Sequence, residues 1–243
     1  MSYDVSFFEK QQAGSRPSAE IVLPLISSLL PFQTHLDVGC GVGAWVAAAD
    51  ALGVESVGVD GDWVNREQLL CRPEQFIAHD LAQPFDLGRR FELVSCLEVA
   101  EHLEPEQGET LVASLVGHGD AVLFSAAMPG QGGTHHVNEQ WPSYWAAKFD
   151  AHGFEVFDVI RSQIWSDQRI KLFYRQNVLF FAKGSPAERL RAVEIRGPLD
   201  VVHPERLQRL EQQHVRRVMG LKELARRVPP AVQVAARKRF KRG

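Results

Sequence analysis

Short apolar runs alternate along the chain with longer segments in which apolar residues recur every three or four positions. The short runs predict buried strands, because parallel strands covered on both faces carry near-continuous apolar side chains. The longer segments are typical of amphipathic helices. We predict strands at 36–38, 57–60, 75–78, 91–97, 121–125, 154–160 and 177–182, and helices at 16–30, 45–52, 106–116 and 141–152. This alternation favours an α/β fold built on a mostly parallel sheet.

A glycine-rich turn, DVGCGVG at positions 37–43, follows the first predicted strand and precedes the first apolar helix of the sheet. Glycine at alternate positions lets the backbone bend sharply and approach a ligand where any Cβ would collide. Gly39, Gly41 and Ala44 also satisfy the dinucleotide-binding pattern G-x-G-x-x-A. Glycine spacing therefore predicts a nucleoside-containing ligand without identifying it.

Asp37 narrows the choice of ligand. A carboxylate two residues before the first glycine would oppose a pyrophosphate at the helix N-terminus, whereas it would suit an ammonium group. S-adenosylmethionine has an ammonium group, a ribose and an adenine but no phosphate. Residues 37–43 resemble the first motif of class I S-adenosylmethionine-dependent methyltransferases. The alternative is a nucleotide-binding oxidoreductase.

The resemblance implies a Rossmann-like fold with a seven-stranded, mostly parallel sheet flanked by helices and closed by an end hairpin. It also implies roles for acids that follow successive predicted strands: Asp60 would accept hydrogen bonds from the ribose, and Asp80 from the adenine amino group. Any one of these acids could instead cap a helix or lie in a solvated loop, but the carboxyl edge of a parallel sheet is where ligands bind. The predicted cofactor-binding residues are Asp37, Gly39, Cys40, Gly41, Asp60, Gly61, Asp80, Leu81 and Leu97. Trp63 is either a stacking partner for adenine or a core tryptophan anchored at the surface.

The segment 124–141, FSAAMPGQGGTHHVNEQW, follows the fifth predicted strand and should lie on the acceptor side of the cofactor. With LEVAEHL at 97–103 and YRQN at 174–177, it resembles a bacterial group of methyltransferases often associated with glycan, lipid or secondary-metabolite pathways. The resemblance covers about residues 3–183. It implies a small-molecule, glycan or lipid-linked acceptor, with the accepting atom (O, N or C) left open.

A hydroxyl acceptor is the leading prediction, and it requires a base, for which histidine is suited at neutral pH. The candidate catalytic residues are His136 and His102, with Glu139 as an orienting carboxylate. Two structural explanations compete with these roles. Asn138 and Glu139 could cap the next helix, and His102 could be a core imidazole.

A metal-assisted reaction is the first alternative function, although no metal is assigned in the leading prediction. Glu98, Glu101 and His102, with a later histidine at 135 or 136, are similar to the metal-ligand pattern of small-RNA 2′-O-methyltransferases. The same Glu-x-x-Glu-His run also occurs in metal-free relatives. The second alternative is a cofactor-binding scaffold without turnover.

Charge divides the chain into two parts. Residues 1–183 contain 12 Lys/Arg and 24 Asp/Glu, whereas residues 184–243 contain 15 and 6. We therefore predict a methyltransferase domain at 1–183, with an N-terminal helical cover at 1–33, and a basic helical tail at 184–243. The tail could pack on the body or on another subunit, or contact an anionic membrane through its final basic run with Phe240. Nucleic-acid binding is the third interpretation of the tail, and it is disfavoured because the acidic body would repel phosphates unless the tail compensates. The oligomeric state stays open.

The compartment is predicted from three observations. The three cysteines fit no metal-binding spacing, and we predict that they are buried, reduced thiols: Cys40, Cys71 and Cys96. No signal peptide is evident at the N-terminus, and no apolar run approaches 18 residues. These observations favour a cytoplasmic protein.

Overall fold

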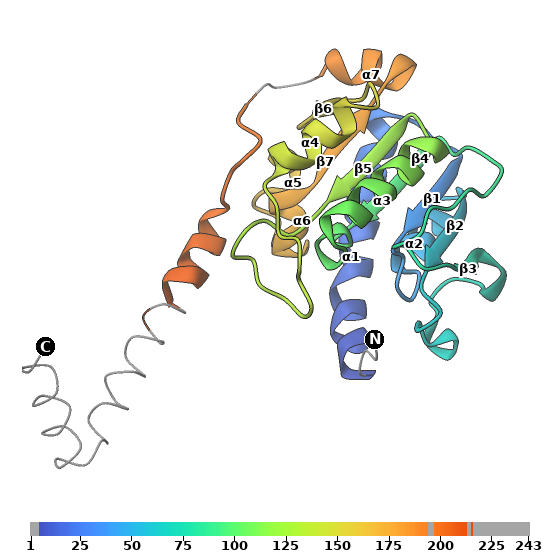
Figure 1. The fold of residues 1–243 in the computed structure, drawn as a ribbon, viewed down its shortest axis with the longest axis horizontal. Helices are drawn as coiled ribbons and strands as arrows, with labels where there is room; N and C mark the ends of the chain where they lie inside the picture. Colours follow the sequence, from blue (N-terminus) through green and yellow to red (C-terminus); the bar gives the residue numbers. More distant parts are fainter. Residues whose placement is uncertain (1–4, 194–196, 213–214, 216–243) are drawn as a thin grey trace, which may run out of the picture. The chain divides into compact units, whose positions relative to one another are not determined.

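The computed structural model describes residues 5–193, 197–212 and 215, with side chains from Ser15 onward. A seven-stranded sheet of order β3-β2-β1-β4-β5-β7-β6 forms its centre (Figure 1). All neighbouring strands are parallel except β7, which is antiparallel to both β5 and β6. This arrangement confirms the predicted Rossmann-like sheet with an end hairpin. The strands are β1 (Thr34–Val38), β2 (Glu55–Asp60), β3 (Phe76–Ala78), β4 (Leu93–Leu97), β5 (Ala121–Ser125), β6 (Glu155–Phe157) and β7 (Leu179–Ala182).

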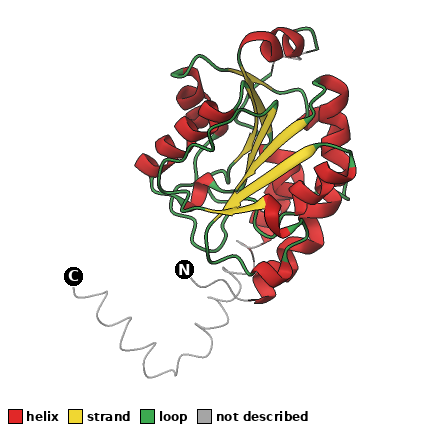
Figure 2. Ribbon diagram, turned by 90° about the vertical axis from the view of Figure 1, so that its right-hand side faces the viewer, coloured by secondary structure: helices red, strands yellow, loops and turns green. Residues whose placement is uncertain are grey.

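Helices cover both faces of the sheet (Figure 2). One core packs α1 (Val5–Leu29) and α2 (Ala44–Ala51) with residues from α5 (Arg161–Ile164), α6 (Leu172–Asn177) and α7 (Gly184–Arg191). A second core packs α3 (Pro105–His118) and α4 (Pro142–Asp150) against the opposite face. Short 3-10 turns lie at Arg66–Gln68, Pro73–Gln75 and Ala100–His102. Coverage on both faces explains why β4 and β5 are buried throughout.

The strand order reverses between β1 and β4. The chain runs outward from β1 through β2 to β3, then returns to place β4 on the other side of β1. Helices on opposite faces then leave a crevice at the carboxyl ends of these two strands, where open α/β sheets bind their ligands. The predicted glycine turn and Leu97 both lie at this edge.

Four elements differ clearly from the sequence prediction. The first helix begins at Val5 rather than near residue 16. Its N-terminal part therefore precedes the segment in which apolar residues recur at helical spacing. The β6 strand is three residues long rather than seven, because it lies at the sheet edge and pairs only with the short β7. Buried Val159 and Ile160 continue its apolar run outside the sheet. The two short helices α5 and α6 were not predicted, since neither spans two helical turns.

The chain divides into two compact units, residues 1–201 and 202–243. The first continues beyond residue 183, where the domain was predicted to end, because Ala187 and Leu190 of α7 are fully buried in the first core. Most of the basic tail, including Phe240, lies outside the described residues. Within the described residues, no helix has the length and hydrophobicity needed to cross a bilayer.

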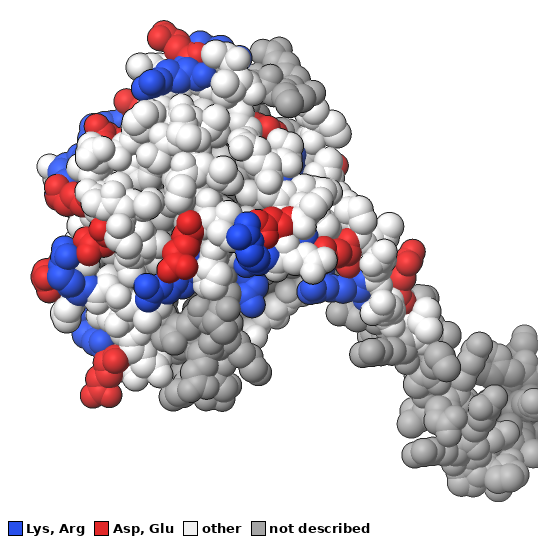
Figure 3. Space-filling view, turned by 180° about the vertical axis from the view of Figure 1, so that it is seen from behind, with Lys and Arg blue, Asp and Glu red and all other residues white. Residues whose placement is uncertain are grey.

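The charged surface and the cysteines add two observations. Figure 3 shows basic and acidic side chains interspersed on the face of the first unit turned to the viewer. Over the described part of that face, no continuous basic stripe of the kind that binds nucleic acid is visible. Cys40, Cys71 and Cys96 are buried and form no disulfide.

Candidate active site

The turn after β1 requires glycine at two positions. Gly39 and Gly43 both have φ of 80°. A Cβ at Gly39 would lie 2.2 Å from Val99 Cγ2, and one at Gly43 would lie 2.4 Å from Cys71 Sγ. Gly39 also donates its N–H to the Val59 carbonyl at 2.8 Å. The turn is therefore held tightly against its neighbours, with its backbone close to the carboxyl edge of the sheet.

Asp60, at the end of β2, fixes this turn from the adjacent strand. One carboxylate oxygen accepts from the Gly41 N–H at 2.7 Å, and the other accepts from the Gly61 N–H at 2.6 Å. Burial raises the pKa of Asp60, and these two hydrogen bonds oppose that change. Each carboxylate oxygen has a second lone pair. Asp60 can thus hold the turn and still accept hydrogen bonds from two hydroxyl groups.

Asp37 lies in a narrow cavity at the end of β1. It is 3% exposed, and Ser95 Oγ donates to its Oδ1 at 2.6 Å. Burial raises its pKa to about 7, with the Ser95 hydrogen bond opposing the rise and the charge of Asp60 adding to it. Gly39, Cys40 and Leu97 line the same cavity. Four of the nine predicted cofactor residues therefore meet here.

The same cavity has a wall that the sequence did not reveal. It includes Ser15 from α1 and Tyr174 from α6, whose hydroxyl oxygens lie 3.3 Å apart. Trp45 packs edge-to-face on Tyr174, with ring centroids 5.5 Å apart. The first helix was predicted to cover the cofactor site, but the contact joins residues 159 positions apart. No local pattern could have identified it.

The five remaining predicted cofactor residues do not line this cavity. Gly41 lies in the turn after β1 and Asp60 ends β2, whereas Gly61, Asp80 and Leu81 follow the ends of β2 and β3. Asp80 is exposed, and its carboxylate accepts from the Ala82 N–H at 3.0 Å, whereas Leu81 is buried. Trp63 is 43% exposed, and its ring lies so close to Gly61 that a Cβ there would be 2.2 Å away. Trp63 is therefore not a core tryptophan; it lies over the end of β2.

Glu98 lies directly after β4 and begins the predicted acceptor side. It has a φ of 57°, which is rare for a residue other than glycine and is typical of functional sites. Its carboxylate accepts from Gln131 Nε2 at 2.6 Å and from Asn177 Nδ2 at 3.0 Å. Asn177 also donates to Gln131 Oε1 at 2.9 Å. Burial raises the pKa of Glu98, while these donors lower it. The network joins β4, the loop after β5 and α6.

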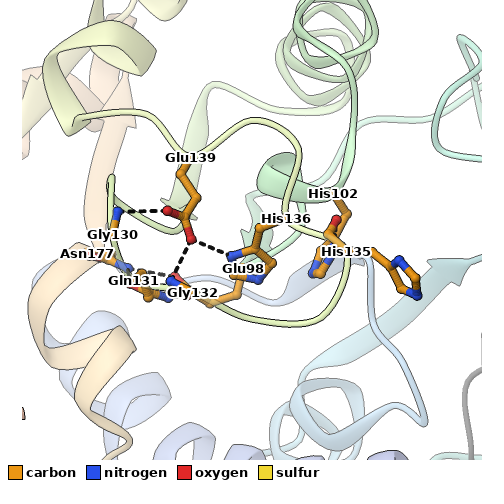
Figure 4. Close-up of polar contacts among 9 residues, drawn as sticks. All are labelled: Glu98, His102, Gly130, Gln131, Gly132, His135, His136, Glu139 and Asn177. Carbon is orange, nitrogen blue, oxygen red and sulfur yellow. Dashed lines mark hydrogen bonds and ion pairs between the residues drawn. The ribbon is translucent and has the colours of Figure 1, made fainter. Parts of the chain in front are cut away.

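Glu139 organises the glycine-rich loop (Figure 4). Its carboxylate accepts from the N–H groups of Gly130 at 2.8 Å and Gly132 at 2.7 Å, and from His136 Nδ1 at 2.9 Å. Burial alone would raise the pKa of Glu139, but the hydrogen bonds from His136 and the two amides lower it. Because the carboxylate accepts from Nδ1–H, a neutral His136 has its lone pair on Nε2.

The helix-capping explanation for Asn138 and Glu139 is wrong. The helix α4 begins at Pro142 without a side-chain cap at Trp141. Its first free amide, that of Ser143, donates instead to Asp200 at 2.9 Å. Glu139 is directed toward the loop that precedes the helix.

His102 and Glu101 complete the acceptor side. The rings of His102 and His136 are perpendicular, with their centroids 4.8 Å apart. The Nδ1 atom of His102 lies 3.3 Å from the carbonyl oxygen of His135. His102 is half-buried, so it is not a core imidazole, and burial lowers its pKa. Glu101 is 1% exposed, and neither carboxylate oxygen accepts a hydrogen bond of normal geometry within the described residues. Burial and the charge of Glu98 raise its pKa well above its usual value.

The sheet order, the glycine turn and the buried acids at the ends of β1 and β2 define a class I S-adenosylmethionine-dependent methyltransferase. A family model described as a methyltransferase domain matches residues 9–159. The chain belongs to this methyltransferase family, and its cofactor is S-adenosylmethionine. No curated protein matches the chain.

Solved structures of low sequence identity share the fold. Magnesium protoporphyrin IX methyltransferase from Synechocystis PCC 6803, with bound S-adenosylhomocysteine, is 19% identical with a TM-score of 0.53, over 76% of this chain and 90% of that one. The amino pentose methyltransferase CalS10 from Micromonospora echinaspora, with bound S-adenosylmethionine, is 17% identical with a TM-score of 0.54, over 76% and 98%. An O-methyltransferase family protein from Burkholderia thailandensis is 15% identical with a TM-score of 0.56; the match spans 74% of this chain and 59% of that one.

Proposed function

We propose that the protein transfers a methyl group from S-adenosylmethionine to a hydroxyl group of a small-molecule, glycan or lipid-linked acceptor, with His136 as general base. The observation that carries this proposal is the hydrogen bond of 2.9 Å between His136 Nδ1 and Glu139. It orients the imidazole and leaves the Nε2 lone pair available to a substrate proton. His102 lies against the same ring and completes the base site.

The reaction is an in-line displacement. The acceptor oxygen forms a bond to the methyl carbon as the carbon–sulfur bond breaks, and the sulfur keeps the electron pair. The hydroxyl proton passes to His136 Nε2, and S-adenosylhomocysteine is released. The protein contributes mainly by positioning the two reactants, which is sufficient for large rate enhancements. In this proposal Asp37 binds the cofactor ammonium group, Asp60 the ribose and Asp80 the adenine, with Trp63 stacked on the base.

The acceptor class follows from the side chains around the base. Hydrogen-bonding groups of Glu98, Gln131 and Asn177 lie on one side, and they suit an acceptor with several hydroxyls. The loop also exposes apolar surface at Val137, which is 54% exposed, and Trp141, which is 37% exposed. A sugar ring offers both hydroxyls and an apolar face. An amino pentose is the stated substrate of the CalS10 enzyme, which shares the fold.

The test is transfer of a labelled methyl group to panels of sugars, glycolipids, other alcohols and amines. For an accepted alcohol, His136→Asn should lower kcat by about 10²–10⁴-fold without changing the affinity for S-adenosylhomocysteine. His135→Asn is the matched control and should leave kcat within about twofold, because the His135 backbone carbonyl that lies 3.3 Å from His102 Nδ1 is kept in this variant. An unchanged kcat in His136→Asn, or transfer to amines alone, contradicts the proposed base. Cofactor binding without transfer to any acceptor would favour the scaffold alternative.

A second candidate is metal-assisted methylation, as in 2′-O-methylation of RNA, and the buried Glu101 favours it. One oxygen of Glu101 and one ring nitrogen each of His102 and His136 lie within 4.8 Å of one another. An ionised carboxylate without hydrogen bonds is costly to bury unless a cation or a proton neutralises it. Two imidazoles and a carboxylate suit Zn²⁺, and Mn²⁺ is the harder ion to compare with it. Glu98, the fourth residue of the predicted pattern, is held by Gln131 and Asn177 instead.

Metal binding separates the two candidates. Titration of chelator-treated protein with Zn²⁺ and Mn²⁺ should show a binding heat and a raised Tm if the cluster is a metal site. Glu101→Gln, which keeps the shape but removes the charge, should abolish both effects. Full transfer activity in chelator-treated protein, with neither effect in the unmodified protein, would leave His136 as the base.

A further inference from the structure

A chain of four buried polar side chains crosses the centre of the sheet. Ser56 Oγ lies 2.8 Å from His35 Nδ1, and His35 Nε2 lies 2.8 Å from Ser95 Oγ. Ser95 Oγ in turn lies 2.6 Å from Asp37 Oδ1. None of the four residues is more than 3% exposed. Only the last of them lines the cavity described above.

The strand register explains how these residues meet. In the parallel ladders His35 is opposite Ser56 on β2, and Asp37 is opposite Ser95 on β4. His35 and Asp37 are two positions apart on β1, so their side chains share one face of the sheet. That face is otherwise apolar and packs on α1 and α2. An aliphatic residue at position 35 would be the ordinary choice for a central strand.

The hydrogen bonds of this chain have one consistent direction. Ionised Asp37 has no proton to donate, so Ser95 must donate its hydroxyl proton to the carboxylate. Ser95 Oγ then accepts from His35 Nε2–H, and His35 Nδ1 accepts from the Ser56 hydroxyl. Burial lowers the pKa of His35 to about 3, so the ring is neutral and has a single N–H. That one proton is directed at Ser95.

We propose that His35 and Ser95 are positioning residues that hold the Asp37 carboxylate in the orientation that binds the ammonium group of the cofactor. The proposal rests on the proposed role of Asp37. Its physical basis is that a buried polar network with every donor used is rigid, whereas a carboxylate without its donor is free to turn away from the ligand. Ser95 acts directly on Asp37, and His35 acts through Ser95.

The test compares two ligands by calorimetry. S-adenosylhomocysteine has the amino-acid end with its ammonium group, whereas 5′-methylthioadenosine retains the adenosine and sulfur but lacks that end. Ser95→Ala should weaken the binding of S-adenosylhomocysteine about tenfold, as expected for loss of one hydrogen bond to a charged group. Binding of 5′-methylthioadenosine should change by less than about twofold, because Asp37 does not contact the adenosine part in this proposal.

Ser56→Ala is the matched control. It removes a buried serine hydroxyl that also bonds to His35, but that hydroxyl does not contact Asp37. It should lower Tm about as much as Ser95→Ala but change the ratio of the two affinities by much less, because Ser56 is linked to Asp37 only through His35 and Ser95. His35→Leu should lower the affinity for S-adenosylhomocysteine relative to that for 5′-methylthioadenosine, as Ser95→Ala does. His35→Gln should lower it less than His35→Leu, because an amide N–H can still donate to Ser95.

Asp37→Asn distinguishes failure of the proposed role of Asp37 from failure of the positioning role of His35 and Ser95. If this variant leaves the ratio of affinities unchanged, the role of Asp37 is wrong, and the positioning role fails with it. If Asp37→Asn changes the ratio but Ser95→Ala does not, only the positioning role is overturned. Equal weakening of both ligands by Ser95→Ala would show a merely structural effect and would also overturn it.

Discussion

The predicted cofactor side and the predicted acceptor side of the candidate site hold their carboxylates in opposite ways. On the cofactor side, Asp60 accepts from two backbone amides at the ends of its own and a neighbouring strand, and Asp37 accepts from a strand residue directly opposite. On the acceptor side, Glu98 and Glu139 are held by a glycine-rich loop and by α6. Glu101 accepts from no side chain among the described residues, and there only backbone amides, its own and that of Ala127, oppose the rise of its pKa. One half is built from adjacent strands, whereas the other is assembled from distant segments.

This difference separates the half of the site that many proteins of this fold can share from the half that can vary among them. Strand ends and a glycine turn can hold one cofactor in many proteins, because their geometry follows from the sheet itself. Loops placed over that sheet can vary without disturbing it. We therefore expect changes on the cofactor side to affect binding of S-adenosylmethionine, and changes on the acceptor side to affect turnover alone.

The largest effect should come from Gly39→Ala. The added Cβ would meet Val99 at 2.2 Å, in a backbone conformation with φ of 80°. Strain and overpacking together cost about 2–5 kcal/mol, so binding of S-adenosylhomocysteine should weaken by about 100-fold. Gly53→Ala is the control, because Gly53 has φ of 79° but no atom within 4 Å of its Cβ position. It should cost about 1 kcal/mol of stability and leave binding intact. Normal binding by Gly39→Ala would contradict the tight turn.

Gly133→Ala should act on the acceptor side. The new Cβ would lie 2.2 Å from His136 Nε2, so the ring must move away from its position beside Glu139. Turnover should fall by about tenfold or more, while the Kd for S-adenosylhomocysteine stays the same. Thr134→Ala, an exposed neighbour in the same loop, is the control and should be neutral. If Gly133→Ala weakens cofactor binding as much as turnover, the separation of the two sides is wrong.

The pH dependence of cofactor binding should reveal Asp37. Its pKa is raised to about 7 in the free protein, and only the ionised form attracts an ammonium group. Affinity for S-adenosylhomocysteine relative to 5′-methylthioadenosine should rise about fivefold from pH 6 to pH 7. It should fall again only at alkaline pH, where the amino group of the ligand loses its proton. Calorimetry across this range gives both affinities. A ratio that does not change with pH would argue against an ammonium–Asp37 contact.

The ratio of the two affinities reports on Asp37 and not on its titratable neighbours. Asp60 also has a raised pKa, but it would bind the ribose present in both ligands. His35 stays neutral because burial lowers its pKa to about 3. The thiols of Cys40 and Cys96 also stay neutral, because burial raises their pKa values well above the usual range.

The smallest effect should be on acid stability through Glu139. Its pKa in the folded protein is lowered, so its stabilising contribution is fully present above the unfolded pKa of about 4.3. That contribution is lost as the pH falls through the lower pKa of the folded state. The difference in Tm between the unmodified protein and Glu139→Gln should therefore narrow as the pH falls from 5 to 3. A difference that is constant over this range would show that the carboxylate charge does not stabilise the loop.

Much of the fold could be predicted from local pattern. The strand β5 has the predicted bounds, 121–125, because a fully buried parallel strand is a continuous apolar run. The extent of β6 could not be predicted, because it depends on the length of the partner with which it pairs. The start of α1 was missed for a related reason: residues 5–14 lack the apolar periodicity by which helices are recognised.

The candidate site divides in the same way. Asp37 and Gly39 were predicted from their place in one turn, and His136 and Glu139, three positions apart, were predicted to act together. The contacts of Ser15 with Tyr174 and of Glu98 with Asn177 join residues 159 and 79 positions apart, and no spacing rule connects them.

By itself, the amino-acid sequence determined the class of enzyme and its cofactor, and it predicted the residues of the cofactor side, since glycines, apolar runs and terminal acids act within a few residues of one another. Only the tertiary structure decided which side chains surround His136 and which donors hold Asp37. Those contacts depend on how strands and loops from distant parts of the chain are brought together, and packing of the whole domain sets that arrangement.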